Sequence, residues 1–137
     1  MMENKCVIII DSELPTGLIA NTAAVLALTL GNKIKDIIGP NVVDGDGKIH
    51  EGITTIPFPI LKSNPVYIKE LRNVIGATYP DLVLVDFSNA AQTTKNYDDY
   101  TKKIAQHTTD ELEYLGIAAY GDKKKINKLA GSLPLLR

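Results

Sequence analysis

The sequence is poor in the residues that build disulfides and metal sites, since it holds one cysteine and two histidines among 137 residues. The single cysteine, Cys6, excludes an internal disulfide, which fits a reducing cytoplasm. Cys6 also opens an apolar run, so we interpret it as a core thiol. His50 and His107 have no partner at metal-ligand spacing, and one cysteine cannot complete a structural zinc site. We therefore predict no metal and no cofactor, and interpret both histidines as loop or surface residues.

Strong charge and long apolar runs are also absent. The net charge is −1 and the pI is near 6.1, so the general basic surface of a nucleic-acid-binding protein is missing. The start of the chain lacks the pattern of a signal peptide. The longest apolar segment, 18–30, is too short to span a bilayer and contains Asn21. We expect a cytoplasmic protein without a membrane partner.

Several motifs that carry chemistry are incomplete. Residues 44–47 alternate aspartate and glycine, but Lys48 and Ile49 stand where an EF-hand loop needs an acid or amide and then a glycine. His50 takes the place of the last glycine of a dinucleotide-binding motif. The chain has no P-loop lysine after a glycine loop and no nucleophile elbow. The segment therefore predicts a turn.

The residues that are present predict one α/β domain over 1–137. Apolar residues make up 45% and charged residues 23%, an ordinary globular balance for a chain of this length. Strands alternate with helices four times, which is typical of a mostly parallel sheet covered by helices on both faces. The predicted strands are 6–10, 53–60, 81–87 and 114–120, with a hairpin at 42–43 and 48–49. The predicted helices begin near residues 15, 65, 97 and 122, with a short helical turn at 108–110.

The first predicted helix, 15–30, is apolar nearly all round. Such a helix is buried on more than one side, and the second cover is either another element or a dimer partner. Asp11 and Ser12 are residue types that cap helices, and Gly31 with Asn32 predicts a left-handed stop.

Prolines limit the second predicted strand. Pro57 and Pro59 remove two backbone donors, so this strand is expected to be short or at an edge.

Candidate site residues gather where two buried strands end. Asp11 and Asp86 lie at or near the carboxyl ends of their strands, where open α/β sheets bind ligands. Asn21 interrupts an apolar helix, so its amide needs a partner. Thr16 and Gly17 offer backbone donors at a helix start. Asp86 is the candidate catalytic residue, and the candidate binding residues are Asp11, Glu13, Thr16, Gly17, Asn21, Ser88 and Gln92.

The lysine cluster on the last predicted helix is a weaker candidate. Lys123, Lys124, Lys125 and Lys128 occupy one short helix, but three consecutive residues point in different directions. A solvated helix face is the default interpretation, and phosphate or RNA contact by Lys123, Lys124 and Lys128 is the alternative.

Nearly the whole chain resembles the family of domains of unknown function numbered two thousand. The order and spacing of the matching segments both hold; they are 11–22, 39–44, 53–57, 85–88, 97–100, 120–121 and 127–136. That family is similar in fold to the type II peptidyl-tRNA hydrolases. The resemblance implies a three-layer α/β/α sandwich, a four-stranded mixed sheet with one antiparallel strand, and often a dimer.

The chain departs from those hydrolases where their chemistry lies. Asn21 stands where their helix carries glutamine, Leu18 replaces a lysine and Ala24 replaces the histidine. Cleaving an ester linked to tRNA calls for cations near the phosphates and a proton-transferring group. The resemblance therefore extends to the fold more than to the activity, and tRNA is a possible but not the favoured partner.

Three hypotheses follow. The leading one is a small-molecule-binding or enzymatic domain of unknown specificity, with its site between the start of the first helix and the loop after the third strand. The second is a peptidyl-tRNA hydrolase that draws its cations from the lysine cluster. The third is a non-enzymatic interaction module in which the apolar first helix forms a homodimer interface.

Overall fold

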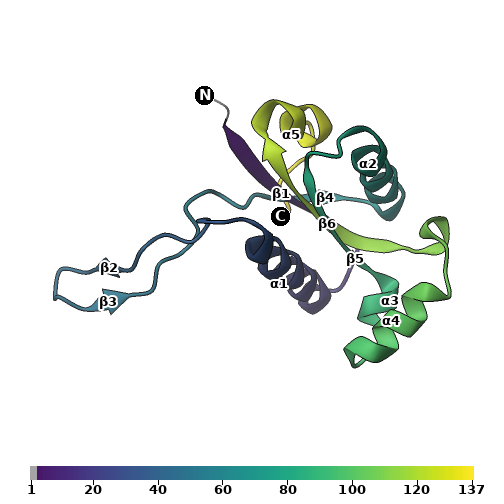
Figure 1. Cartoon of the computed structure of the whole chain (residues 1–137), viewed down its shortest axis with the longest axis horizontal. Coiled ribbons are helices and arrows are strands. Elements are labelled where there is room, and N and C mark those ends of the chain that lie inside the picture. The colour runs from purple at the N-terminus through teal and green to yellow at the C-terminus, as the bar shows by residue number, and fades with distance from the viewer. Residues whose placement is uncertain (1–2) are drawn as a thin grey trace.

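The computed structural model describes residues 3–137 and places a four-stranded mixed sheet at the centre of the molecule (Figure 1). In spatial order the strands are β4 (Ile60–Ser63), β1 (Asn4–Asp11), β6 (Tyr114–Asp122) and β5 (Val83–Ser88). β1 is parallel to β4, whereas β6 is antiparallel to both β1 and β5. The single antiparallel strand agrees with the resemblance.

The alternation of strands and helices alone predicted a mostly parallel sheet, and this prediction was wrong at β6. The segment between β5 and β6 forms α3 (Asn89–Gln92), α4 (Tyr97–Ala105) and the 3-10 turn η1 (Thr109–Glu111). Figure 1 shows α3 and α4 beyond the end of β5 rather than across a face of the sheet. Because this connection does not cross the sheet, the chain re-enters from the end it left, and β6 runs back antiparallel.

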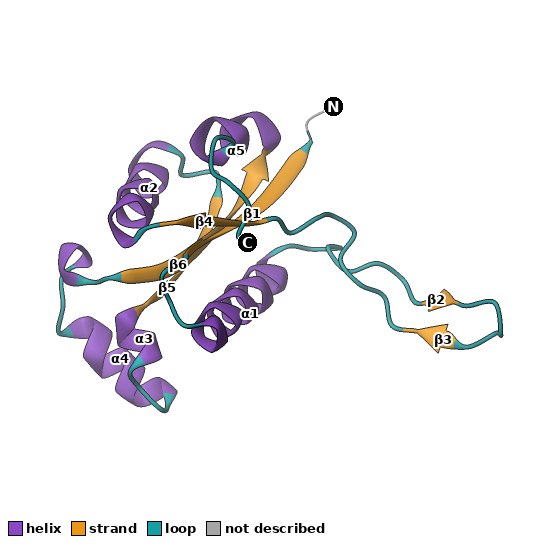
Figure 2. Cartoon of the chain, turned by 180° about the vertical axis from the view of Figure 1, so that it is seen from behind, coloured by secondary structure: helices purple, strands orange, loops and turns teal. Residues whose placement is uncertain are grey.

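Helices cover both faces of the sheet and make three layers. α1 (Thr16–Lys33) lies on one face, and α2 (Pro65–Thr78) and α5 (Lys123–Ala130) lie on the other (Figure 2). Alternate residues of β1 enter the two cores: Val7 and Ile9 pack with α2 and α5, and Cys6 packs on the side of α1. Burial raises the pKa of the Cys6 thiol to about 12, as expected of a core thiol.

The two edges of the sheet differ. The C-terminal tail lies along β4, where the Lys62 amide donates to Pro134 O at 2.9 Å and the Leu136 amide donates to Ile60 O at 2.9 Å. β5 forms the other edge, and no strand of the described residues 3–137 pairs beyond it. The second strand is short and at an edge, as the prolines predicted, but its expected start was wrong. Residues 53–59 stay outside the four-stranded sheet, and β4 begins after Pro59.

The first helix is longer than predicted at its C-terminal end. It runs through Gly31 to Lys33, so the left-handed stop was wrong; the residue with positive φ that follows the helix is Asp36, at 64°. At the other end Pro15 is the N-cap residue and no side chain caps the helix. Asp11 instead accepts a hydrogen bond from the Glu13 amide on Oδ1 at 3.0 Å, which tightens the turn before the helix.

Residues 39–52 leave the body of the molecule as an arm (Figure 1). Its strands β2 (Val42–Val43) and β3 (Ile49–His50) form a separate two-stranded antiparallel sheet, which confirms the predicted hairpin. A search of the described helices finds none that is both long and apolar enough to cross a membrane.

Candidate functional site

A cleft of about 380 Å³ opens beside the free edge of β5. α1 supplies one side of the cleft, β5 the floor, and the segment from α3 to α4 the other side. The lining residues are Val25, Thr29, Val85, Asp86, Phe87, Ala91, Thr94, Lys95, Asn96, Tyr97 and Tyr100. The volume is at the lower end of the range for small-molecule sites, and the walls are mainly apolar.

Local sequence explains why these side chains meet. Val85 packs on the core beside α1, and Asp86, as its neighbour in a strand, points to the opposite face. Asn96 starts α4 by accepting a hydrogen bond from the Asp99 amide on its side-chain oxygen at 2.8 Å. This cap places Tyr97 and Tyr100 one turn apart, with their rings edge-to-face and centroids 5.5 Å apart.

Asp86 is held by an ion pair between β5 and α2, the helix that covers this face of the sheet. Arg72 on α2 donates from Nε to Asp86 Oδ2 at 3.2 Å, and both side chains are about one quarter exposed, at 26% and 24%. The Arg72 guanidinium also lies 5.2 Å from the centroid of the Tyr114 ring, which fixes its position. Burial, followed by the negative charge of Asp86, raises the pKa of the Tyr100 hydroxyl. The site therefore combines an oriented carboxylate with the protonated phenol of Tyr100.

The cleft has unused hydrogen-bonding capacity. Arg72 provides the one side-chain hydrogen bond to Asp86 among the described residues, whereas a carboxylate accepts several. Lys95, at the rim, makes no ion pair with any acid in the described range 3–137. A ligand can thus meet one anionic and one cationic group between apolar walls.

The structure brings few of the predicted site residues together. Asp86 lines the cleft, but Glu13, Thr16 and Gly17 are exposed around the start of α1 and do not line it. Asn21 is also exposed, so water can satisfy its amide without the partner that the sequence predicted. In the single chain, the side of α1 that carries Asn21 is open to solvent.

The other three predicted binding residues lie at strand or helix ends. Asp11 is buried at the end of β1 and bonds to its own turn, as described above. Ser88 is buried at the end of β5, and its hydroxyl has no hydrogen-bond partner within the described part of the chain. Gln92 is exposed at the last position of α3. None of the three lines the cleft.

The lysine cluster lies on a different part of the molecule. α5 packs on β1 and β6, on the face opposite to α1, and both figures place it away from α3 and α4. Lys123 pairs with Glu3 at 3.1 Å and Lys125 pairs with Asp81 at 2.6 Å, while Lys124 and Lys128 are exposed. Acids therefore neutralise part of the surface that the hydrolase hypothesis needs to be basic.

Sequence reasoning missed Arg72, Lys95, Tyr100 and Tyr114. A partial signal existed in Tyr97 and Tyr100, because residues three apart share one face of a helix. Arg72 carried no such signal, since its partner Asp86 is on another element, 14 residues further along the chain.

Comparisons with known proteins identify the family. A family model described as a protein of unknown function, DUF2000, matches residues 4–137, and the chain belongs to that family. The fold is similar to the solved structure of a protein of unknown function, Atu0240, from Agrobacterium tumefaciens strain C58. The TM-score is 0.87 with 17% sequence identity, over 98% of each chain. At this identity the similarity shows the fold alone. No curated protein matches the chain. The similarity to type II peptidyl-tRNA hydrolases stays a prediction.

Proposed function

We propose that the protein binds a small, largely apolar molecule in the cleft beside β5, with a hydrogen-bond donor of that molecule on Asp86. The observation that carries the proposal is that Asp86, the one acidic residue among those lining a mainly apolar cleft, has its carboxylate held by Arg72 at the open edge of the sheet. An amine or amide donor gains a charge-assisted hydrogen bond there, and the aromatic rings of α4 offer contact area.

The cleft supports binding better than nucleophilic catalysis. Its lining residues include no serine, cysteine or histidine, so no nucleophile stands beside a histidine base. A catalytic role for the same cleft, in which Asp86 accepts a proton from the bound molecule, remains a hypothesis. Hydrolysis of peptidyl-tRNA gains no support from the lysines of α5, because two of that helix's lysines are paired with acids.

A fragment screen by NMR tests the proposal. Small aliphatic and aromatic amines are titrated into the labelled protein, with carboxylic acids of the same shape as a second set. We expect amines to shift the methyl signals of Val25, Val85 and Ala91. Asp86→Asn, which keeps the shape and removes the charge, is expected to weaken amine binding by roughly tenfold or more.

Asp98→Asn is the matched control, because Asp98 is an exposed acid on the same helix as the tyrosines but does not line the cleft. Equal weakening by both substitutions, or shifts that map elsewhere, would contradict the assignment of the site.

A homodimer is the second part of the proposal. The exposed side of α1 supports it: Leu28 is 79% exposed on a helix whose opposite side fills one of the two cores. The surface involved is separate from the cleft and is argued next.

A further inference from the structure

The arm, residues 39–52, exposes apolar side chains on both of its strands. Val42 and Val43 of β2 are 57% and 65% exposed, and Ile49 of β3 is 71% exposed. β2 and β3 pair only with each other. A two-stranded hairpin alone is marginally stable in water, so an arm of this composition gains stability from a cover.

The root of the arm is nevertheless firmly built. The Gly39 amide donates to Ile53 O at 2.8 Å, and the Thr55 amide donates to Ile37 O at 2.7 Å. Gly52 packs so closely on Gly39 that a Cβ at position 52 would lie 1.8 Å from the Gly39 carbonyl oxygen. The arm therefore projects in a set direction instead of folding back onto its own body (Figures 1 and 2).

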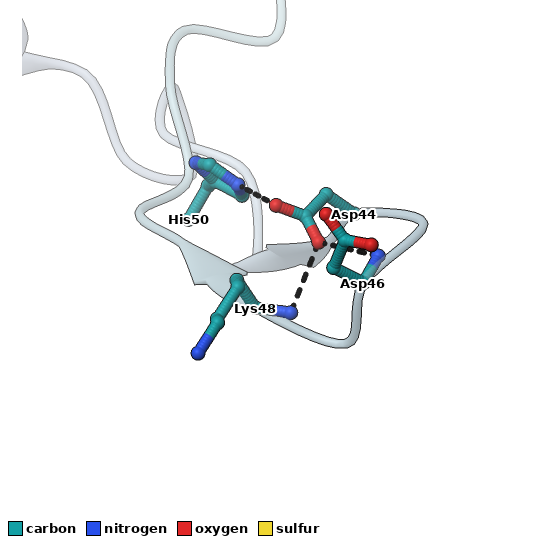
Figure 3. Close-up of polar contacts among 4 residues, drawn as sticks. All are labelled: Asp44, Asp46, Lys48 and His50. Atoms are coloured by element: carbon teal, nitrogen blue, oxygen red, sulfur yellow. Dashed lines mark hydrogen bonds and ion pairs between the residues drawn. The ribbon is translucent and has the colours of Figure 1, made fainter.

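The tip is ordered by its own polar contacts (Figure 3). The carboxylate of Asp44 contacts His50 Nε2 at 2.7 Å and accepts hydrogen bonds from the amides of Asp46 and Lys48 at 2.9 and 3.0 Å. These bonds close the turn and leave the valine and isoleucine side chains uncovered.

An apolar groove lies beside the root of the arm. It has a volume of about 650 Å³ and is lined by Ala27, Leu28, Gly31, Asn32, Ile37, Ile38, Thr54 and Phe58. Leu28 and Ile38 in this groove are 79% and 57% exposed. The groove and the arm are thus two neighbouring apolar surfaces of one chain, each without a cover.

The exposed area matches what a dimer requires. The chain exposes 8785 Å², whereas a compact monomer of 14.9 kDa is expected to expose roughly 7,000 Å². The large apolar side chains of the arm, its root and the groove expose on the order of 700 Å², close to the roughly 800 Å² that each partner buries in a standard interface. Patches above a few hundred Å² mark interaction sites in otherwise monomeric proteins.

Charge favours a second copy as the occupant. Acids outnumber lysines on the arm, through Asp44, Asp46 and Glu51, whereas lysines flank the end of α1 beside the groove, through Lys33 and Lys35. The chain as a whole has a net charge of only −1, so two copies repel each other little. A two-fold arrangement satisfies both surfaces at once.

We propose that two copies of this chain exchange arms, so that the arm of each copy lies in the groove of the other. The interface is reciprocal: Val43 and Ile49 of one copy pack near Leu28 and Ile38 of its partner copy. This inference rests on the homodimer proposed above and specifies its interface, and it is independent of ligand binding in the cleft beside β5.

The test is sedimentation of the full chain and three variants over a concentration range. Val43→Lys changes the arm and Leu28→Lys changes the groove, and each is expected to raise the dissociation constant of the dimer roughly a hundredfold or more, because it buries an unpaired charge. Val66→Lys is the matched control. Val66 is 70% exposed on α2, on the other face of the sheet, so this variant should remain dimeric. Thermal unfolding verifies that each variant is folded.

Mixing the two monomeric variants distinguishes arm exchange from other dimers. The Val43→Lys chain keeps an intact groove and the Leu28→Lys chain keeps an intact arm, so the mixture retains one native contact of the two. We expect heterodimers in the mixture at concentrations where each variant alone is monomeric. A monomeric unmodified chain at roughly 100 µM, far above the micromolar dissociation constants at the weak end for such areas, would overturn the proposal. So would a mixture that stays monomeric, or a dimer that survives both substitutions.

Discussion

The strand β1 and the arm are built from the same residue types and end in opposite environments. β1 contributes Val7 and Ile9, which are 3% and 1% exposed, whereas Val43 and Ile49 of the arm are 65% and 71% exposed. Both segments form strands with ladder partners. The difference lies in what covers them: β1 has strands on both sides and helices on both faces, while each arm strand has one neighbour. Hydrophobic composition predicts a strand, and the neighbouring elements decide whether that strand is a core or an interface.

The largest expected difference in the free energy of unfolding comes from truncating an isoleucine to alanine in each of the two regions. We expect Ile9→Ala to lower the free energy of unfolding by about 2–5 kcal/mol, because it leaves a cavity between β1 and the helices. Ile49→Ala should change it by less than about 0.5 kcal/mol in a monomeric Val43→Lys background, because Ile49 has little to lose there. Urea denaturation measures both. Similar losses at the two positions would show that the arm is covered by its own chain.

Glycine substitutions sharpen the comparison at two close approaches. A Cβ on Gly116 would lie 2.9 Å from Ile9 O and 3.0 Å from Thr22 Cγ2, inside the core. We expect Gly116→Ala to lower the free energy of unfolding by about 1–3 kcal/mol through overpacking.

Gly52→Ala makes a closer clash, but at the root of the arm. It should weaken dimerisation and shift the NMR signals of the arm, while the urea midpoint of the core changes little. A large loss of core stability from Gly52→Ala would indicate that the root of the arm and the core unfold together.

Thr22 offers a substitution with the opposite sign. Thr22 lies on the buried side of α1, and its hydroxyl is fully buried and has no hydrogen-bond partner among residues 3–137. Thr22→Val keeps the shape and removes an unsatisfied polar atom, so we expect a gain of about 1 kcal/mol in the free energy of unfolding. Thr29→Val, at an exposed position of the same helix, should change it by less than about 0.5 kcal/mol. A loss of stability in Thr22→Val would reveal a partner for the hydroxyl, such as a bound water.

The elements of the core were predictable because their patterns are local. The apolar run at 6–10, the helical spacing of Ile68 and Leu71, and the hairpin at 42–50 each indicate structure within a few residues. The direction of β6 was not predictable in this way, because it depends on where α3 and α4 lie in space. A resemblance to a known family supplied the single antiparallel strand.

The cleft was predictable in part, through Asp86 and the loop that follows its strand. The position of Asp86 near the end of a buried strand is a local signal, whereas its ion pair with Arg72 and its neighbours on α4 arise from packing between distant segments. For Asn21, in contrast, the sequence predicted a contact that the structure does not require. An amide in an apolar helix suggested that a partner is needed, but the helix has one face on the sheet and another open to solvent.

The smallest expected effect is a pH dependence confined to the tip of the arm. The His50 ring lowers the pKa of Asp44 below its ordinary value of 3.8, and the amides of Lys48 and Asp46 lower it further. A carboxyl with a depressed folded-state pKa stabilises the fold above its unfolded value, and this stabilisation is lost as the pH falls through the folded value. We therefore expect the amide signals of Asp46 and Lys48 to lose their hydrogen-bonded shifts as the pH falls below 3.8, before the signals of β1 change. Asp44→Asn should abolish that transition and Asp46→Asn should preserve it, whereas a transition shared by arm and core would mean that the arm has no independent stability.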